Sequence, residues 1–430
     1  MAVRSTMLRL FLFAFLALPL SAQSIVIRNV NVVDLKGGVL LRERNVVIRD
    51  GVIVEGAPPE GATVVDGRGK YLIPGLWDMH VHLSWTTASA LPVLLANGVT
   101  GVRDLGSSLP ELDAWRTRIE DGSLAGPRIV RVGPILNGQS FNKYQLVTGN
   151  PDQTRGVARA LKFAGVDALK THRRMERESY FALVDEAKKL GLRVVGHIPM
   201  TVTPAEASEA GQQTIEHVAT LFEGTFQQLV VGSLGDAIRA WREKGAAELF
   251  ATFVKNGTVF DPTLIAYHRV LHAGDPAQLR YVAASLRKEF AERKPLTPEQ
   301  LAEWKNAYDE YGAVVKMAAD AGVTIVTGSD IAAERVPGFT LHDELELLVA
   351  AGLTPLQAVR AATVNSAAVV NVSAAIEPGA RADLVLLDAD PLADIRNTRK
   401  IHAVIARGKL LRRAELDRLL AQGEALAARN

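Results

Sequence analysis

Residues 75–83 read GLWDMHVHL, and they place two of the nine histidines of the chain one residue apart in an apolar stretch. The stretch has the length and composition of a buried β-strand. Side chains at positions i and i+2 of a strand point to the same face, so His80 and His82 share one face. This predicts a strand that ends in a pair of imidazoles, and the rest of the sequence decides what they face.

Similar apolar stretches recur along residues 75–373, with amphipathic helical stretches between most of them. The eight predicted strands are LWDMHVHL, VTGVRDLG, RIVRVGP, DALKTH, RVVGHIP, TIEHVA, TVFDPTL and TIVTGSD. Glycines such as Gly98 and Gly191 close helical stretches just before a strand. Eight strands that alternate with helices favour an α/β fold, a (β/α)8 TIM barrel. A doubly wound open sheet is disfavoured, because no glycine-rich nucleotide-binding motif follows any strand.

Both ends of the mature chain predict a second, smaller domain. Residues 25–74 alternate apolar and polar residues between turn signals, and residues 374–412 are β-like again. We therefore expect a small β-sandwich domain formed by 25–74 plus 374–412, with the barrel of residues 75–373 inserted between them. Residues 413–430 predict a polar C-terminal helix.

The first residues carry a targeting pattern. MAVRSTMLRLFLFAFLALPLSAQS has a basic start, an apolar run over 10–20 and a small-residue end. The run is short for a bilayer span, so residues 1–24 predict a cleaved signal peptide rather than a retained anchor. We expect an exported protein, periplasmic or secreted, with no membrane attachment in the mature form.

Charge and cysteine content exclude several classes of function. The 430 residues have a formal net charge of +2, and Arg4 and Arg9 of the leader account for it. No nucleic acid or anionic membrane surface is therefore expected as the main partner, which leaves a small-molecule substrate and a possible homo-oligomer. The chain has no cysteine, so any metal must be held by nitrogen and oxygen ligands.

Polar residues end five of the predicted strands. They are His80 and His82 on strand 1, Lys170 on strand 4, His197 on strand 5, His217 on strand 6 and Asp330 on strand 8. Singly, each has a structural explanation, since a lone strand-end histidine is most often a hydrogen-bonded core residue and an aspartate can cap a helix. Barrel active sites form at the carboxyl ends of strands, so the six can converge. Such a buried cluster is too polar for packing alone and indicates an organising cation.

This pattern of H-x-H, lysine, two further histidines and aspartate resembles the amidohydrolase superfamily of metal-dependent hydrolases. The motifs PGLWDMHVHL, GHIP, IEHVA, TGSD and AGLTPLQAVRAATVNSA are most similar to the imidazolonepropionase-like branch, which includes dipeptidases acting on Xaa-Pro and Xaa-Arg/Lys substrates. The resemblance covers Ser24 to Leu411, and the split β-domain fits it.

The resemblance implies a binuclear metal centre. The six side chains would share two divalent ions, with His80, His82 and Asp330 on the first, His197 and His217 on the second, and Lys170, carboxylated by CO₂, on both. Zinc is the default ion, with cobalt and manganese as alternatives. The implied reaction is hydrolysis of a peptide or N-acyl amino acid amide by a metal-activated hydroxide, with Asp330 carrying the proton to the leaving nitrogen.

Candidate substrate contacts lie at the end of strand 4, where His172 shares the strand face of Lys170, and in the loops after strands 4 and 7. They are His172, Arg173, Tyr267 and His268, although solvation at the strand mouth also explains loop residues of this kind. An arginine at position 173 could pair with a substrate carboxylate. Dipeptidases of this branch often carry an aromatic residue two positions after the strand-5 histidine, where this chain has Pro199. Dipeptide specificity therefore does not transfer directly.

Other functions stay open on the same residues. Cyclic-amide, lactone or phosphotriester hydrolysis would use the same metal centre, whereas a mononuclear deaminase would not need Lys170. A non-enzymatic binding protein is disfavoured, because none of the six ligands is missing. Two helix starts are also predicted, one at Thr297 and one at Thr340, where the spacing to Asp343 is that of a cap beside His342.

Overall fold

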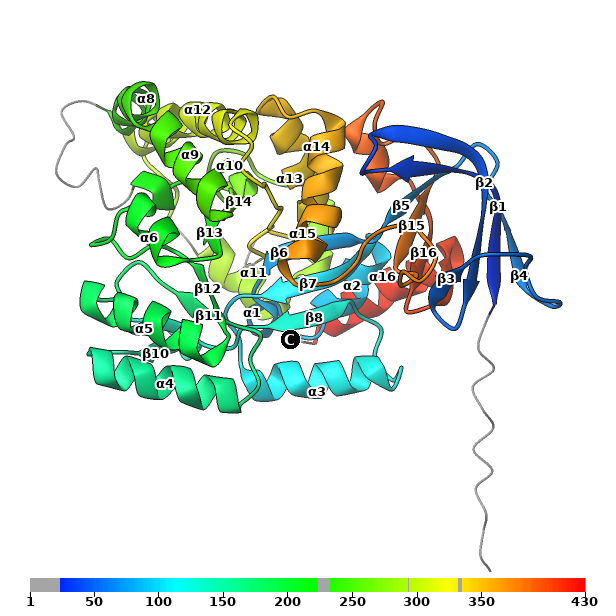
Figure 1. Ribbon diagram of the computed structural model, residues 1–430, viewed down its shortest axis with the longest axis horizontal. Coiled ribbons are helices and arrows are strands. Elements are labelled where there is room, and N and C mark those ends of the chain that lie inside the picture. Colours follow the sequence, from blue (N-terminus) through cyan, green and yellow to red (C-terminus); the bar gives the residue numbers. More distant parts are fainter. Residues whose placement is uncertain (1–23, 223–232, 293, 332–334, 430) are drawn as a thin grey trace, which may run out of the picture.

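A helix-covered barrel and a smaller β-domain lie side by side in the computed structural model of the protein (Figure 1). The structure describes residues 24–222, 233–292, 294–331 and 335–429. Apart from Ser24, the predicted signal peptide lies outside the described residues. Within the described ranges, no helix combines the length and the apolar character needed to cross a bilayer.

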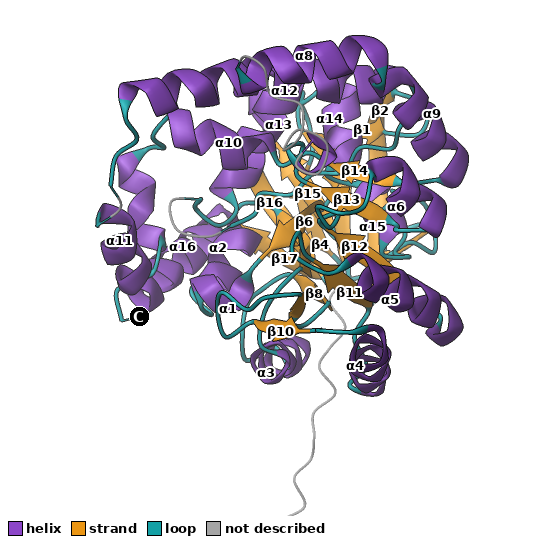
Figure 2. Ribbon diagram, turned by 90° about the vertical axis from the view of Figure 1, so that its left-hand side faces the viewer, coloured by secondary structure: helices purple, strands orange, loops and turns teal. Residues whose placement is uncertain are grey.

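The barrel is built from parallel strands surrounded by helices (Figure 2). Its strands are β6 (Leu76–Val81), β7 (Val99–Asp104), β8 (Arg128–Arg131), β9 (Ile135–Asn137), β10 (Gln145–Val147), β11 (Ala168–Thr171), β12 (Arg193–Gly196), β13 (Thr214–Glu216) and β14 (Val259–Asp261). Every residue of β6 and β7 is buried, as expected for strands covered by helices outside and by side chains inside. The TIM-barrel prediction is confirmed.

The third strand position is divided in two. The strand β8 pairs with β7 on one side, and β9 pairs with β11 on the other. Gly133 lies between the two pieces with φ +80°, a conformation that glycine adopts without strain. The predicted strand over 128–134 therefore ends at Arg131, and a second strand, β9, begins at Ile135.

The eighth strand position is irregular. Residues 324–331 form isolated parallel bridges, from Ile325 to Phe260 and from Ile331 to Val81, rather than a continuous strand. The segment still lies between β14 and β6 and closes the barrel. A side chain at Gly328 would place its Cβ 2.4 Å from the Cβ of His80, so the chain passes unusually close to β6 here. The prediction of a regular strand over 324–330 was wrong for this reason.

Helices cover the outside of the barrel and its ends (Figure 2). They are α1 (Leu83–Thr86), α2 (Ala90–Ala96), α3 (Leu109–Glu120), α4 (Pro151–Phe163), α5 (Arg177–Leu190), α6 (Pro204–Ala210), α8 (Leu234–Lys244), α9 (Ala246–Asn256), α10 (Leu264–Leu271), η1 (Pro276–Tyr281), α11 (Ala284–Ala291), α12 (Pro298–Asp320), α13 (Phe339–Ala350), α14 (Pro355–Ala361) and α15 (Val364–Val369). The helix start at Thr297 is confirmed by a capping box with Gln300. The start at Thr340 was wrong, because α13 begins at Phe339 after Gly338, which packs tightly on Asn97.

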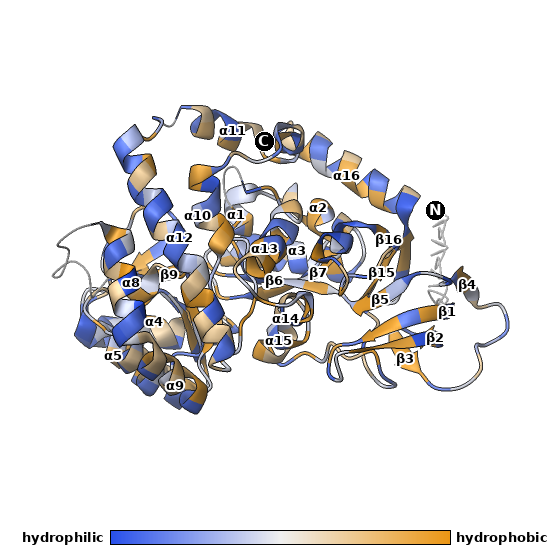
Figure 3. Ribbon diagram, turned by 90° about the horizontal axis from the view of Figure 1, so that it is seen from above, coloured by the Kyte–Doolittle hydropathy of each residue, from blue (hydrophilic) through white to orange (hydrophobic). Residues whose placement is uncertain are grey.

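The smaller domain draws its strands from both ends of the chain, as predicted (Figure 3). They are β1 (Ile25–Asp34), β2 (Val39–Arg49), β3 (Val52–Val54), β4 (Thr63–Asp66), β5 (Tyr71–Pro74), β15 (Leu384–Leu387), β16 (Ile401–Ala406) and β17 (Lys409–Arg412), with η2 (Ile395–Arg399) between β15 and β16. These strands form one mixed sheet, in which β5 pairs antiparallel with β15. Early and late strands share one hydrophobic cluster, which includes Ile27 and Leu386.

The C-terminal helix α16 (Arg413–Ala427) returns to the barrel and packs on α2. Its Leu416 is fully buried, and its Gly423 lies so close to Val93 that a side chain there would collide. The helix predicted as polar therefore has one buried face.

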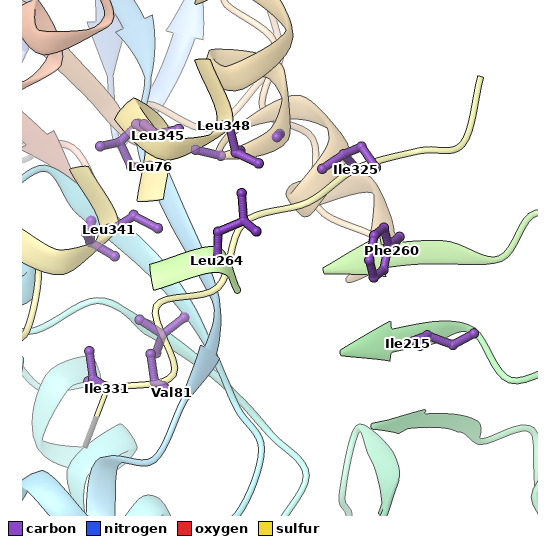
Figure 4. Close-up of a cluster of buried hydrophobic side chains, with 14 of the residues drawn as sticks. Leu76, Val81, Ile215, Phe260, Leu264, Ile325, Ile331, Leu341, Leu345 and Leu348 are labelled. Carbon is purple, nitrogen blue, oxygen red and sulfur yellow. The ribbon is translucent and has the colours of Figure 1, made fainter. Parts of the chain in front are cut away.

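A large hydrophobic cluster joins the barrel strands to α13 (Figure 4). Val81 and Phe260 come from the strands, and Leu341 and Leu345 come from the helix. Burial of such a side chain contributes about 1.5–3 kcal/mol to folding. The cluster fixes α13 and α10 against the barrel strands.

Candidate active site

Four histidines meet at the carboxyl ends of the barrel strands. The ring centroid of His80 lies 5.2 Å from that of His82 and 4.6 Å from that of His217. The ring of His217 lies 4.5 Å from that of His197. The i, i+2 spacing thus places both β6 histidines on the inner face, as predicted, and the loops after β12 and β13 supply the other two.

Lys170 and Asp330 complete the cluster. The Nζ atom of Lys170 lies 3.5 Å from Nε2 of His80 and is buried. The Oδ1 atom of Asp330 lies 3.2 Å from Nε2 of His82 and 3.5 Å from Nε2 of His80. The structure therefore brings all six predicted residues to one place.

Nδ1 faces an oxygen atom of the protein on two of the rings. Nδ1 of His82 lies 3.3 Å from the carbonyl oxygen of Gly106, which can only accept, so this nitrogen carries the proton. Nδ1 of His217 lies 2.7 Å from Oγ1 of Thr263. Metal-binding histidines in proteins commonly hold their second nitrogen in this way.

Burial keeps the imidazoles of His80 and His217 neutral. Burial, reinforced by the positive charge of Lys170, lowers the pKa of His80 well below its ordinary value. The pKa of His217 falls to about 4, mainly because of burial, although Asp330 opposes the shift. Burial likewise lowers the pKa of Lys170 to about 8, and an uncharged amine is the form that can react with CO₂. Neutral imidazole is the form that binds a metal.

Asp330 is held from its outer side by Arg335. The guanidinium donates from Nη2 to Oδ2 of Asp330 at 3.1 Å and from Nε to its main-chain oxygen at 2.5 Å. Burial alone would raise the pKa of Asp330, but the positive charge of Arg335 outweighs it and keeps the pKa below its ordinary value. The carboxylate therefore stays ionised, with Oδ1 directed toward the histidines.

A buried ion pair lies inside the barrel next to the histidine cluster, and the sequence interpretation missed it. Arg103 donates to Oε1 of Glu216 at 2.6 Å and to the main-chain oxygen of Met79 at 2.8 Å. Both partners directly precede a site histidine in the chain. The sequence did carry a signal for this pair, because an arginine within an apolar strand such as VTGVRDLG needs a buried partner.

The structure places the four predicted substrate contacts in different surroundings. His172 joins the cluster, with its ring 4.4 Å from that of His197, and Arg173 lines a groove of about 550 Å³ with Arg174 and Met200. Tyr267 packs on Tyr311 at 4.8 Å between ring centroids, and its hydroxyl accepts from the Ala219 amide.

His268 stacks near His272 and Tyr308 rather than on a site histidine. A substrate role for His172, Arg173, Tyr267 and His268 stays a prediction.

The donor atoms fit divalent ions. Ligand atoms of His80, His82 and Asp330 lie within 4.8 Å of one another. Nδ1 of His80 and of His197 has no hydrogen-bond partner within the described part of the chain, so hydrogen bonding in the protein does not by itself account for these buried rings. Two kinds of donor, imidazole nitrogen and carboxylate oxygen, match the preferences of zinc.

Comparisons with known proteins agree with this geometry. Residues 71–411 match the model of the amidohydrolase family. The chain is 26% identical to a dihydroorotase from Pelotomaculum thermopropionicum over 90% of this chain and 95% of that protein. A Bifidobacterium longum structure assigned as a prolidase is 26% identical, with a TM-score of 0.70 over 93% of this chain and 99% of that one. Bottromycin amidohydrolase has a TM-score of 0.77 at 24% identity, over 94% of this chain and 90% of that one, which shows a shared fold. The chain belongs to the amidohydrolase family.

Proposed function

We propose that the protein is a binuclear metal-dependent hydrolase that cleaves an amide bond of the peptide or N-acyl amino acid type. The observation that carries the proposal is the position of Lys170, whose buried Nζ lies 3.5 Å from His80 Nε2 inside a cluster of histidines. An ammonium group cannot bind a cation, whereas a carbamate on the same nitrogen offers two oxygens to two ions. The likeness to a protein assigned as a prolidase supports the amide substrate.

The residues would divide between two ions as the family resemblance implies. His80, His82 and Asp330 would hold the first, His197 and His217 the second, and carboxylated Lys170 both. When bound, the ions polarise the scissile carbonyl and make a water molecule acidic enough to act as nucleophile near neutral pH. Zinc is the ion that this donor set favours.

The chain itself supplies the proton transfer. Asp330 is ionised and lies at the mouth of the cluster with a side chain 16% exposed, so it can take a proton from water and deliver it to a leaving nitrogen. Arg335 holds the outer oxygen, which keeps Oδ1 directed at the histidines. Substrate would enter over the loops that carry His172 and Arg173. The groove beside Arg173 would accept a carboxylate.

Metal content and a substrate screen test this proposal. The parent protein should hold about two divalent ions per chain, and Lys170→Ala should hold fewer at both positions. Small carboxylates such as formate should restore part of its activity. Unchanged metal content in Lys170→Ala would remove the bridging role. Dipeptides and N-acyl amino acids should be cleaved in a screen that also contains lactones and phosphotriesters.

A cyclic amide is the second candidate substrate. The likeness to a dihydroorotase extends over nine-tenths of this chain, and cyclic-amide hydrolysis could use the same residues. The same screen separates the two, because a cyclic-amide hydrolase would open ring amides and leave dipeptides intact.

We also propose that the protein is exported after cleavage of residues 1–24. The support is the sequence pattern of a basic start and a short apolar run. N-terminal sequencing of the native protein should begin near Gln23 or Ile25. A native protein that begins at Met1 or Ala2 would exclude cleavage.

A further inference from the structure

Thr263, at the end of β14, has a backbone that its side chain disfavours. Its φ of 45° and ψ of 48° lie in the left-handed region, which is rare for a β-branched residue. Such strain persists only where the surroundings impose it, and it concentrates at functional sites. Two ligand residues of the same site, His217 and Asp330, share this left-handed backbone, with φ of 70° and 48°.

The hydroxyl of Thr263 does not cap the helix that Thr263 precedes. Thr263 is the N-cap of α10, where a threonine usually accepts a hydrogen bond from the first turn of the helix, yet its side chain makes no such bond. Instead, Oγ1 lies 2.7 Å from Nδ1 of His217, and both residues are buried. The hydroxyl therefore faces a site residue rather than its own helix.

Glu344 of α13 caps α10 in its place. Its buried carboxylate accepts from the amides of Leu264 at 3.0 Å and Ile265 at 2.7 Å. Figure 4 shows Leu264 on the side of α10 near Leu341 and Leu345 of α13, so apolar packing holds the two helices together around this contact. A cap supplied from another helix leaves the threonine hydroxyl free to turn toward His217.

The main chain reinforces the same contact. The amide of His217 donates to the carbonyl of Asp261 at 2.8 Å, and the amide of Val218 donates to that of Pro262 at 3.0 Å. Both the backbone and the ring of His217 are therefore fixed by residues 261–263. Rotation of the ring would break the hydroxyl contact without disturbing the backbone.

We propose that Thr263 is a positioning residue that fixes the ring and tautomer of His217, with Glu344 holding Thr263 in its strained conformation. The hydroxyl oxygen accepts a hydrogen bond from Nδ1–H of His217, which leaves the Nε2 lone pair for a metal. This inference rests on the proposed metal centre for its consequence, but the tautomer itself is a property of the metal-free protein. Loss of such a contact typically weakens metal binding by about 10–100-fold.

Four variants test the assignment. Thr263→Val keeps the shape and loses the hydroxyl, Thr263→Gly loses the hydroxyl and relieves the backbone strain, and Thr263→Ser keeps the hydroxyl. The matched control is Thr220→Val, because Thr220 is buried, its amide donates to the main-chain oxygen of His217, and its hydroxyl has no partner in the described structure. Circular dichroism establishes which variants are folded.

Two measurements then decide. In ¹⁵N-histidine-labelled, metal-free protein, with His217 assigned by its absence in His217→Gln, long-range ¹H–¹⁵N spectra should show the Nδ1–H tautomer in the parent, Thr263→Ser and Thr220→Val. Thr263→Val and Thr263→Gly should show a mixture. Zinc affinity, measured by chelator competition, should fall about 10–100-fold in those two and less than 3-fold in Thr263→Ser.

The proposal is overturned if folded Thr263→Val or Thr263→Gly keeps the parental tautomer and zinc affinity. It is also overturned if Thr263→Ser loses as much affinity as Thr263→Val, because the hydroxyl would then not be the cause. A parent protein that binds no zinc would refute the proposed function, whereas the tautomer measurement on metal-free protein would still decide the role of Thr263.

Discussion

Histidines buried at the two ends of the barrel differ in how they are satisfied. At the carboxyl end, Nδ1 of His80 and of His197 has no hydrogen-bond partner among the described residues. At the amino end, His342 of α13 is equally buried, but both of its ring nitrogens are engaged. Nδ1 lies 2.9 Å from Oγ1 of Thr398, and Nε2 lies 3.0 Å from the main-chain oxygen of Asn97.

The difference suggests how a structural histidine can be told from a proposed metal ligand. Burial alone does not separate them, since His80 is 0% and His342 is 1% exposed. What separates them is whether protein groups saturate the ring. A buried imidazole with an unused nitrogen lowers stability unless another partner binds, whereas His342 links the barrel to the small domain as a satisfied hydrogen-bonding group.

The largest expected effect lies at the carboxyl end. Asp330→Asn should reduce turnover about 10³-fold, because an amide still offers an oxygen to a metal but cannot accept the proton. Metal content should stay near that of the parent, and His80→Ala should lose both metal and turnover. Steady-state kinetics beside elemental analysis measure this. Parental turnover in metal-replete Asp330→Asn would show that another group carries the proton.

The second expected effect concerns the free energy of unfolding, and it is larger at the amino end of the barrel than at the carboxyl end. His342→Ala should lower the free energy of unfolding by about 2–4 kcal/mol, because it leaves a cavity and removes the partners of Thr398 and Asn97. The same substitution at His80 in metal-free protein should lower it by less than half as much. Chemical denaturation of both variants without metal makes the comparison. Equal losses would mean that the free ring nitrogen of His80 has no energetic significance.

The third effect is the pH dependence that His342 brings. Burial lowers its pKa to about 3, while an unfolded histidine titrates near 6.5. Between these values the unfolded chain binds the proton and the folded chain does not, so stability is present above pH 6.5 and falls as pH falls. The loss from His342 between pH 6.5 and 5 is about 2 kcal/mol. Unfolding free energies across this range should be correspondingly less steep in His342→Gln, and identical slopes would contradict the assignment.

The smallest effect concerns an exposed histidine. His402 is 41% exposed and lies 3.1 Å from Asp388, which is 48% exposed. Exposed ion pairs of this kind contribute about 0–1 kcal/mol, so His402→Ala should change the unfolding free energy by less than about 0.5 kcal/mol. It should leave metal content and turnover unchanged. A larger loss of stability would show that burial and hydrogen bonding do not by themselves predict how much each histidine contributes to the stability of this protein.

Much of the fold can be predicted from local sequence patterns. The alternation of strands and helices predicts the barrel, because buried parallel strands such as β6 are apolar throughout. The i, i+2 spacing of His80 and His82 predicts that both face inward, and the structure agrees. The irregular closing segment near Gly328 could not be predicted, because its geometry depends on the close approach to His80 across the barrel.

The parts of the site that the sequence interpretation missed depend on distant partners. Arg103 stands 113 positions from Glu216, and Glu344 stands 80 positions from Leu264, so no local pattern couples them. Thr263 carried a misleading signal, since a threonine before a helix predicts an ordinary cap. Only the three-dimensional structure shows that its hydroxyl faces a histidine instead.

The pairing of β5 with β15 has a consequence for the time course of folding. Leu72 lies opposite Leu386, so the sheet of the small domain cannot be completed until nearly the whole chain exists. At typical synthesis rates the roughly 300 intervening residues take about 15–60 s. During that interval β5 lacks its neighbour and presents an open strand edge, a known starting point for aggregation. A chaperone that shields residues 25–74 would therefore act while this edge is open.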